Sequence, residues 1–437
     1  MPDYLFLMES RLPLAQWQVV SQVQKAAEAL GMNLYLVGGA VRDLIGGFPI
    51  EDLDFVVEGK ALKLVRELGR QQAPRTQGVG GEVRVAWRNE AQQAAELEFP
   101  SGDVVSVSMV RAEGGSGPLR SQAIPATILD DLRRRDFSIN AIGISLNPQS
   151  RGLLLDPTNG VADLEKKQIR TLHPYSFLAD PIRMFRAVRF RTRLTFTFEA
   201  KTAAQFQNAR ESKVQEKIPG EVLAQEFRQI ARETGPAEIL KALEKEKLLT
   251  VLSPRLQGPR VDWQGMARAS KAGQGLAVAG LRVRSFPLFL YLLTSKLPPR
   301  DQSQVAERLR LKQADRQTLR RLAENARRLA KELGGKGAGT PTKLFQLLSA
   351  SPPELILLVL AEYPQAIIQT RIRNYLRKYL PLRLKLPEKE LHELGVAPES
   401  PRFRKILDLY FYALLEGKVR TKTEQAKFLK KLVQTGK

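Results

Sequence analysis

Cysteine is absent from this 437-residue chain, and histidine is scarce, since only His173 and His392 occur. The lack of cysteine excludes disulfides, thiolate zinc sites and cysteine nucleophiles, and two histidines are too few for a histidine metal cluster. No apolar run approaches the roughly 20 residues that span a bilayer. The first residues, MPDYLFLMESRLPLAQW, lack the basic start of a secretory signal. We therefore expect a cytoplasmic protein.

Positive charge is abundant by contrast. Lysine and arginine number 69 against 46 aspartates and glutamates, which gives a formal net charge of +23. Such an excess favours polyanionic partners, because each neutralised phosphate releases counterions. A basic surface kept for solubility is the alternative, but a nucleic acid or nucleotide partner is favoured. The hydrophobic fraction of 43% is ordinary for a globular protein with a core.

The first 150 residues or so carry mixed signals for helices and strands. Apolar spacing predicts helices over about 14–30, 40–47 and 60–71. Alternating or short apolar runs predict strands over about 33–39, 52–59, 82–87, 94–100 and 103–110. Glycine and proline predict a loop over 114–127. The segment 126–146 begins as a helix and ends near a strand.

After about residue 160 nearly every segment has helical spacing. The segment 313–337 is a basic amphipathic helix that ends at glycines, and an RNA-facing helix and a solvated helix face are equally compatible with it. The segment 351–368, SPPELILLVLAEYPQAII, is too short to span a membrane and is interpreted as a core helix.

Asp52 and Asp54 lie two residues apart in the strand-like run EDLDFVVEG. Side chains i and i+2 of a strand point to the same face, so Leu53 and Phe55 should point the other way, into a core. Two neighbouring carboxylates repel each other unless a divalent cation joins them. A Mg²⁺ site completed by substrate phosphates is one interpretation. One surface aspartate beside one capping aspartate is the other.

The preceding segment GGAVRD favours the metal interpretation. Gly38 and Gly39 end a predicted strand and open a predicted helix, where backbone amides can approach a phosphate closely. Arg42 adds a charged donor. The spacing matches neither G-x-G-x-x-G nor a Walker loop. Two glycines, an arginine and a D-x-D strand together predict a nucleoside triphosphate beside a metal.

The segment RRRDFSINA supplies further polar candidates. Arg133, Arg134 and Arg135 stand in a row, which is more basic than a helix face needs. Asp136 and Asn140 follow as groups directed at a sugar or a base.

The segment FLADPIRMFRAVRF places Arg183, Arg186 and Arg189 at intervals of three on one drifting helical face. Asp180 precedes Arg183 by three residues, so a carboxylate and a guanidinium lie side by side. Such a pair offers an acceptor and donors to the edge of a base. A salt bridge within the helix is the alternative, and spacing alone favours it.

Taken together, these motifs resemble the class II tRNA nucleotidyltransferase and bacterial poly(A) polymerase family. The resemblance is strong over roughly residues 30–230, and a weaker likeness to the closing helices of that family lies at 394–432. It is carried by LVGGAVRD, EDLDFVVEG, DLRRRDFSINAIGISL, LLLDPTNGVADL and DPIRMFRAVRF.

The resemblance implies an α+β fold class. A nucleotidyltransferase head with a small mixed sheet and helices would occupy residues 1–150. An all-helical neck with nucleotide-base recognition would follow over 151–265, and a helical body and tail that bind tRNA over 266–437.

The resemblance also implies the chemistry, which is template-independent addition of CCA, or part of it, to the 3′ end of tRNA from CTP and ATP. Asp52 and Asp54 would be the catalytic residues and would hold Mg²⁺, following two-metal displacement logic. Asp180 and Arg183 would act as the amino-acid template for the incoming base. The expected nucleotide-binding residues are Gly38, Gly39, Arg42, Arg134, Arg135, Asp136, Asn140, Asp180, Arg183, Arg186 and Arg189.

Three positions depart from the family pattern. The third carboxylate of the family falls on Ser106, and neither Glu98 nor Asp103 is in register to replace it. The template motif begins with Ala179 rather than an acidic residue. A later helix carries Pro219 where the family has an arginine.

Three interpretations of the activity are compared. Addition of CCA is favoured over addition of A alone or CC alone, because the region between Asp54 and Arg134 is long enough for the flexible loop that the final A requires. A poly(A) polymerase is the second enzyme interpretation. A catalytically weak RNA-binding paralogue is the third, and Ser106 is its best support.

Overall fold

The computed structural model describes residues 4–71, 83–111, 126–281, 283 and 285–435. The chain divides into two compact units, Met1–Ile218 and Pro219–Lys437. The finer division predicted above, with boundaries after residues 150 and 265, stays a prediction. Most of the predicted 114–127 loop lies outside the described residues, as does part of the region expected to hold the flexible loop.

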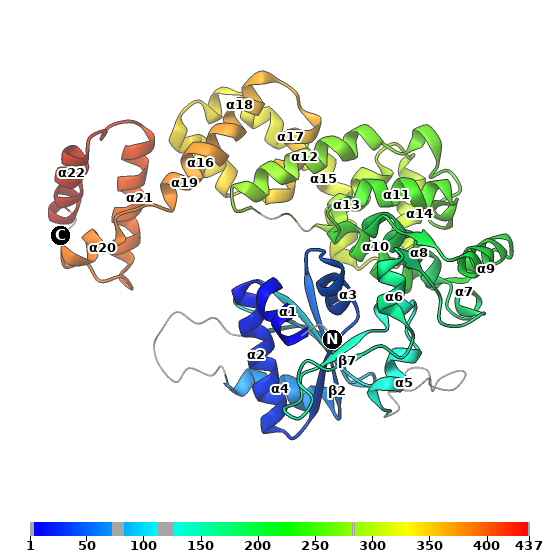
Figure 1. Ribbon diagram of the computed structural model, residues 1–437. Coiled ribbons are helices and arrows are strands. Elements are labelled where there is room, and N and C mark those ends of the chain that lie inside the picture. Colours follow the sequence, from blue (N-terminus) through cyan, green and yellow to red (C-terminus); the bar gives the residue numbers. More distant parts are fainter. Residues whose placement is uncertain (1–3, 72–82, 112–125, 282, 284, 436–437) are drawn as a thin grey trace. The chain divides into compact units, whose positions relative to one another are not determined.

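The first unit is built on a mixed sheet, which carries the labels β2 and β7 in Figure 1. Its strand order is β3-β4-β5-β2-β1-β6-β7. β2 and β5 are parallel and the other neighbours are antiparallel. The strands are β1 (Asn33–Val37), β2 (Asp52–Glu58), β3 (Arg84–Asn89), β4 (Ala94–Glu98), β5 (Val104–Met109), β6 (Gly143–Ser145) and β7 (Leu154–Leu155).

Helices α2 and α4 pack side by side against this sheet, α2 on β1 and α4 on β4 and β5. Alternate residues are buried in β4 and β5, and likewise Leu53, Phe55 and Val57 in β2, so this face of the sheet lies in a core. The helices of the unit are α1 (Tyr4–Arg11), α2 (Leu14–Ala29), α3 (Gly39–Gly46), α4 (Ala61–Gln71), α5 (Ile128–Arg133), α6 (Gly160–Glu165), α7 (Ser176–Ala179), α8 (Ile182–Leu194) and α9 (Ala200–Glu211), with 3-10 turns η2 (Ser138–Asn140) and η3 (Val214–Lys217).

The opposite face of the sheet carries a smaller apolar cluster beneath α5. Val56 of β2 packs there with Ile128 and Leu132 of α5. Because Val56 lies two residues beyond Asp54, it shares the face of both aspartates. This packing fixes α5, with the arginines at its end, on the face where the aspartates lie.

One local prediction in the segment after residue 160 was wrong. The short strands β8 (Gln168–Ile169) and β9 (Thr197–Phe198) pair in parallel within the region expected to be all helical. Ile169 is fully buried, and a strand of two residues has no helical or strand period to read. The fold class is confirmed, since a mixed-sheet head precedes a largely helical remainder.

The second unit is helical throughout its described residues. One core draws on α12, α13, α15, η6, α16, α17, α18, η7 and α21, and a smaller core joins α20, α21 and α22. The elements are α10 (Gly220–Arg232), α11 (Pro236–Lys245), η4 (Leu248–Val251), η5 (Gly258–Arg260), α12 (Trp263–Val278), α13 (Phe286–Thr294), α14 (Pro299–Arg308), α15 (Gln313–Gly334), η6 (Lys336–Ala338), α16 (Pro341–Ser349), α17 (Pro353–Glu362), α18 (Ala366–Asn374), the π-helical η7 (Tyr375–Tyr379), α19 (Leu380–Arg383), α20 (Glu388–Glu393), α21 (Pro401–Leu415) and α22 (Lys422–Thr435).

The segment predicted as a single core helix over 351–368 is two helices. α17 ends at Glu362, and α18 begins at Ala366 beyond Pro364. Proline lacks the backbone N–H for the helical bond and disfavours helix at the residue before it. The predicted burial is confirmed, because Leu358 and Val359 are fully enclosed. Among the described helices, none is by itself long and apolar enough to cross a bilayer, and α16 and α17 meet that test together only as a pair bent by 113°.

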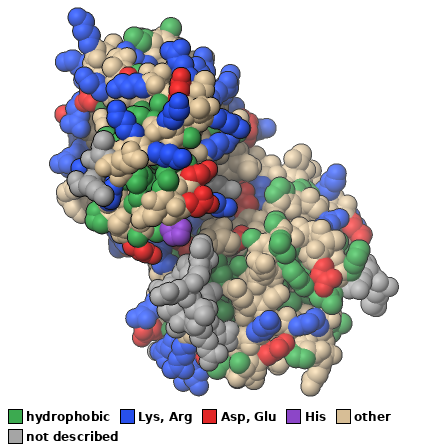
Figure 2. All heavy atoms as spheres, turned by 90° about the vertical axis from the view of Figure 1, so that its left-hand side faces the viewer, with side chains coloured by type: hydrophobic (Ala, Val, Ile, Leu, Met, Phe, Trp, Pro, Cys, Tyr) green, Lys and Arg blue, Asp and Glu red, His purple; other side chains and the backbone are tan. Residues whose placement is uncertain are grey.

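The predicted basic helix is confirmed as α15. Leu322, Ala326 and Leu333 lie on its buried stripe, while its arginines and lysines lie on the outer side. Lysine and arginine side chains are numerous on the face of the molecule in Figure 2. Whether α15 contacts RNA stays a prediction.

Candidate active site

The two aspartates of β2 lie as strand geometry predicts. Leu53 and Phe55 are completely buried, which confirms that they point into the core, whereas Asp52 and Asp54 are half-buried. The carboxylates therefore share the face opposite α2 and α4.

Ser106 of β5 lies directly opposite Asp54 in the parallel register. Its hydroxyl donates a hydrogen bond of 2.5 Å to Asp54 Oδ1. No lysine or arginine in the described part of the chain forms a salt bridge with Asp54. A neutral hydroxyl that orients the carboxylate thus occupies the position where the family resemblance leads one to expect a third carboxylate.

Neither of the two acids considered as replacements lies in the row of Asp54 and Ser106, because Glu98 is opposite Val104, in the row of Asp52, and Asp103 precedes β5. Glu98 pairs with exposed Arg84, and Asp103 accepts a hydrogen bond from Ser101. Glu96, which the sequence reasoning did not consider, is the residue opposite Ser106 in β4. Its side chain shares the face of Asp54, at a distance of two strands. Glu96 could not be recognised from the sequence, because its place opposite Ser106 depends on the strand register, which the sequence alone leaves open.

Gly38 and Gly39 form the turn between β1 and α3. Gly38 has φ 68° and ψ −128°, a conformation that side chains disfavour. A Cβ atom there would lie 2.6 Å from Arg135 Nη1, and one at either glycine would lie 3.6 Å from Asp54 Oδ2. The turn, a guanidinium and a carboxylate oxygen therefore meet in one small space.

Asp131 holds the two arginines that follow α5. Its side chain is 1% exposed and forms ion pairs with Arg134 at 2.5 Å and with Arg135 at 3.0 Å. Burial by itself would raise the pKa of Asp131, but the charges of Arg135 and Arg134 outweigh it and keep the pKa below its usual value. The sequence reasoning did not single out Asp131. Its spacing of three and four residues from two arginines is a signal that could have found it.

A continuous chain of hydrogen bonds joins the GGAVRD, RRRDFSINA and arginine-rich motifs. Arg42 Nη1 donates to Asn140 Oδ1 at 2.8 Å, and Asn140 Nδ2 donates to Asp136 Oδ1 at 2.9 Å. Arg186 Nη1 lies 3.0 Å from Asp136 Oδ2. Burial would raise the pKa of Asp136, but the Arg186 charge and the Asn140 amide lower it overall. Residues more than 140 positions apart are thereby fixed together.

Arg42 is 1% exposed and is bound on two sides in this structure. Besides Asn140, it contacts Asp43 through Nε at 2.8 Å and Nη2 at 2.9 Å. Asp43 also pairs with Arg193 of α8 at 2.8 Å. Arg42 thus lies within the site and is held by protein groups.

Asp180 and Arg183 lie beside each other at the start of α8. Arg183 Nε is 3.3 Å from Asp180 Oδ2, while its other nitrogens donate to Ser176 Oγ and to the backbone oxygen of Arg134. The Asp180 side chain is 47% exposed, so its carboxylate remains open to a ligand.

Arg189 is buried, with its guanidinium over the Phe190 ring.

The other two departures from the family pattern, Ala179 and Pro219, lie next to the ends of helices. Ala179 ends α7, directly before Asp180, and Pro219 is the residue before the first turn of α10. The φ of Pro219 is −59°, close to the value at which the proline ring fixes the backbone.

Comparison with known proteins gives three kinds of match. Residues 34–170 match the family described as the Poly A polymerase head domain. An A-adding tRNA nucleotidyltransferase of Geobacter sulfurreducens is 27% identical over 99% of this chain and 49% of its own length. One of Aquifex aeolicus is 30% identical over 83% of this chain and 42% of its own length.

One similar solved structure is a crystal structure of a tRNA nucleotidyltransferase complexed with a primer tRNA and an incoming ATP analog, whose sequence is 30% identical to this chain. The match covers 83% of this chain and 99% of that chain, with a TM-score of 0.55. The chain belongs to the tRNA nucleotidyltransferase and poly(A) polymerase family. It spans about half the length of the curated relatives it matches.

The donor set fits the divalent metal that this nucleotidyltransferase family implies. Asp52 and Asp54 offer carboxylate oxygens on one face, and Ser106 orients one of them. Among the described residues, no group of three or more acidic or histidine side chains is arranged to hold a metal. Oxygens of the substrate would therefore complete the shell, as is usual for Mg²⁺.

We expect Arg42→Met to destabilise the protein by about 1–3 kcal/mol, because the Asn140 amide oxygen loses a donor and the buried Asp43 carboxylate loses Arg42 while keeping Arg193. Chemical denaturation of the full chain checks this. The matched control is Arg84→Met, which breaks an exposed pair with Glu98 and should cost about 1 kcal/mol or less. Equal losses in both variants would show that the Arg42 contacts add no more stability than an exposed ion pair.

Proposed function

We propose that this chain is a tRNA nucleotidyltransferase that adds nucleotides to the 3′ end of tRNA without a nucleic-acid template. The substrates are ATP and CTP, and the product is CCA or part of it. The observation that carries the proposal is the hydrogen-bonded chain from Arg42 through Asn140 and Asp136 to Arg186. It gathers three motifs beside the Asp54 carboxylate.

In this proposal Asp52 and Asp54 hold Mg²⁺ against the triphosphate. When bound, the metal would stabilise charge on the phosphate oxygens and favour deprotonation of the RNA 3′-hydroxyl. Ser106 keeps Asp54 in one orientation through its 2.5 Å hydrogen bond. The Gly38–Gly39 turn lets the phosphates approach the backbone, and Arg135, next to Gly38, supplies positive charge.

Base selection is assigned to Asp180 and Arg183. The carboxylate accepts and the guanidinium donates, so the pair can complement the edge of cytosine or adenine. Three contacts, to Asp180, Ser176 and the Arg134 backbone, hold the guanidinium in place. A fixed donor loses less entropy on binding than a mobile one.

The proposal is tested with tRNA transcripts that end before CCA, after C or after CC, each incubated with Mg²⁺ and one labelled nucleotide. Transfer of a single A to the transcript ending in CC is the expected result. Long A tails would indicate a poly(A) polymerase instead. No incorporation by a protein that still binds tRNA would indicate an RNA-binding paralogue.

Addition of A alone is a second candidate, because both relatives compared above are called A-adding tRNA nucleotidyltransferases. The transcript that lacks CCA separates the two candidates. Two C and one A would support complete CCA addition, as the sequence favours. Failure on that transcript, with A added after CC, would support the narrower activity.

Asp180→Ala should blur the choice between CTP and ATP, because the template loses its acceptor. We expect the ratio of kcat/KM values for the two nucleotides to change about tenfold or more, which matches the loss of one charged hydrogen bond. Single-nucleotide incorporation assays measure the ratio. Glu165→Ala, which removes an exposed carboxylate on α6, is the control and should leave the ratio unchanged. An unchanged ratio in Asp180→Ala would remove Asp180 from the template.

A further inference from the structure

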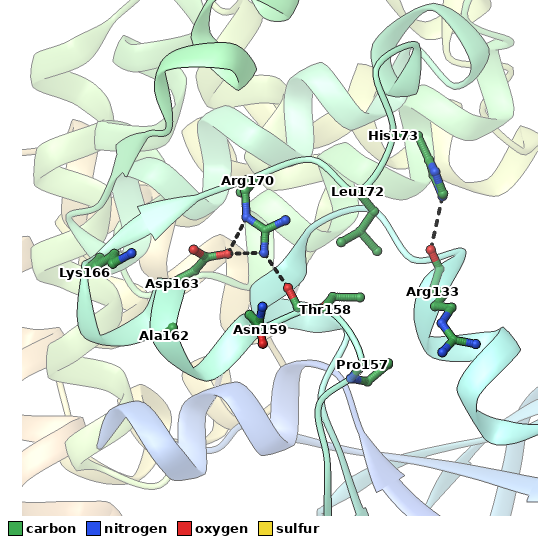
Figure 3. Close-up of a pocket in the computed structure, with 10 residues that line it drawn as sticks. All are labelled: Arg133, Pro157, Thr158, Asn159, Ala162, Asp163, Lys166, Arg170, Leu172 and His173. Atoms are coloured by element: carbon green, nitrogen blue, oxygen red, sulfur yellow. Dashed lines mark hydrogen bonds and ion pairs between the residues drawn. The ribbon is translucent and has the colours of Figure 1, made fainter.

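A basic hollow lies on the first unit, apart from the site just described. It encloses about 650 Å³ between α5, α6 and the segment that follows β8 (Figure 3). None of the proposed catalytic or nucleotide-binding residues lines it. Arg133 and His173 form one side, and Asn159, Lys166 and Arg170 lie on the other.

Arg170 is held rigidly in this hollow. Its Nε lies 2.8 Å from Asp163 Oδ2, and its Nη2 contacts the same oxygen and the Thr158 backbone oxygen. Asp163 is buried and also accepts a hydrogen bond from Ser138. The hollow therefore contains a neutral Asp163–Arg170 pair, and the guanidinium is oriented before any ligand arrives.

The remaining charge in the hollow is positive. Arg133 and Lys166 are both exposed, and neither forms a salt bridge with any residue in the described ranges. His173 is anchored through Nε2 to the Arg133 backbone oxygen at 3.1 Å. The lining thus combines two exposed cations that form no salt bridge in the described ranges with an oriented guanidinium and the Asn159 amide, which are the donors that phosphate oxygens accept from.

The surroundings favour a phosphodiester backbone over a free nucleotide. A nucleotide pocket encloses its ligand in apolar walls with groups that read the base. Here Arg133, Lys166 and His173 are exposed, and the nearby Tyr175 has 72% of its surface exposed. An exposed aromatic beside a basic groove is typical of surfaces that track a nucleic-acid strand.

We propose that this hollow binds backbone phosphates of the RNA substrate, at a place separate from its 3′ end. The inference rests on the proposed function, since it concerns the same RNA. The first unit would then contact the RNA at two places. The hollow would hold the RNA backbone, and the proposed active site would add nucleotides to the 3′ end.

The test is tRNA binding by the double variant Arg133→Gln/Lys166→Gln, measured by fluorescence polarisation without nucleotides over a series of KCl concentrations. We expect the Kd to rise about tenfold and the slope of log Kd against log salt to fall by about 1 to 2, because about two phosphate contacts are lost. The control is Lys60→Gln/Lys63→Gln, which removes two exposed charges near the start of α4 and should behave as wild type.

A second measurement needs no variant. Bound tRNA should protect Lys166 from acetylation, with Lys63 as the reference in the same molecule. Wild-type binding in the double variant, or an unprotected Lys166, would overturn the inference and leave the proposed function standing. Failure of the wild type to bind tRNA would overturn the proposed function and the inference with it. Loss of labelled ATP binding by the double variant, in the absence of RNA, would assign the hollow to a free nucleotide and overturn the RNA assignment.

Discussion

Asp54→Asn is expected to lower kcat/KM for nucleotide transfer by about a thousandfold or more. The asparagine keeps the size of the side chain but removes the charge that we propose holds the metal. A metal contributes several kcal/mol of transition-state stabilisation, and each 1.36 kcal/mol is about tenfold in rate. Asp52→Ala and Asp54→Ala should abolish transfer as well. Incorporation of labelled ATP into tRNA ending in CC measures the loss.

The same variants should bind tRNA with an affinity within about twofold of wild type, because two half-buried carboxylates contribute little to backbone phosphate binding. Asp103→Asn is the matched control, since it removes a carboxylate just before the neighbouring strand β5 and should keep full activity. Substantial transfer by Asp54→Asn would contradict the metal assignment. Loss of tRNA binding would point to a structural role instead.

Gly38→Ala is expected to lower kcat/KM about a hundredfold and to lower the free energy of unfolding by about 1–3 kcal/mol. The φ of 68° with ψ −128° strains any residue with a side chain. The new Cβ would also lie 2.6 Å from Arg135 Nη1, so the guanidinium must move away from the turn. A misplaced charged group close to the proposed triphosphate site lowers the rate, because a shift of about 1 Å in a positioning group can cost a hundredfold.

Two other glycines separate these causes. Gly39→Ala introduces contacts of 3.6 Å at an ordinary φ, so it should keep the stability of wild type. Gly69→Ala lies within α4 with open space around it and should stabilise the chain by up to about 1 kcal/mol without changing activity. Thermal unfolding and steady-state kinetics measure both effects. If Gly38→Ala matched Gly39→Ala in both, neither the strain nor the Arg135 collision would matter.

Features that depend on the residues of a single segment could be predicted from local sequence patterns. Alternation in EDLDFVVEG correctly separated Leu53 and Phe55 from the aspartates, because a strand has a period of two whatever surrounds it. The break at Pro364 was missed, although its cause is equally local. The short strands β8 and β9 were missed for another reason, since two residues carry no period and pairing alone defines them.

Long-range partners were beyond the reach of the sequence. Arg42 was predicted as a triphosphate contact, and that role stays a prediction. Nothing in GGAVRD indicated that its guanidinium would meet Asn140, 98 residues later. Asp43 and Glu96 were missed because their significance depends on which residues fold against them. Asp131 was missed although its spacing from Arg134 and Arg135 is a local signal.

By itself, the sequence determined the mixture of strands and helices in about the first 150 residues, the largely helical continuation, the facing of the two aspartates and the motifs that carry the family resemblance. These follow from side-chain periodicity and residue order, which are properties of each segment. The tertiary structure alone decided that Ser106 bonds to Asp54, that Asp136 joins Asn140 to Arg186, and that a basic hollow forms away from the aspartates. Each of these contacts requires strand register or the packing of segments that are distant in the sequence. They are therefore set by the free energy of the whole fold and not by the pattern of any one segment.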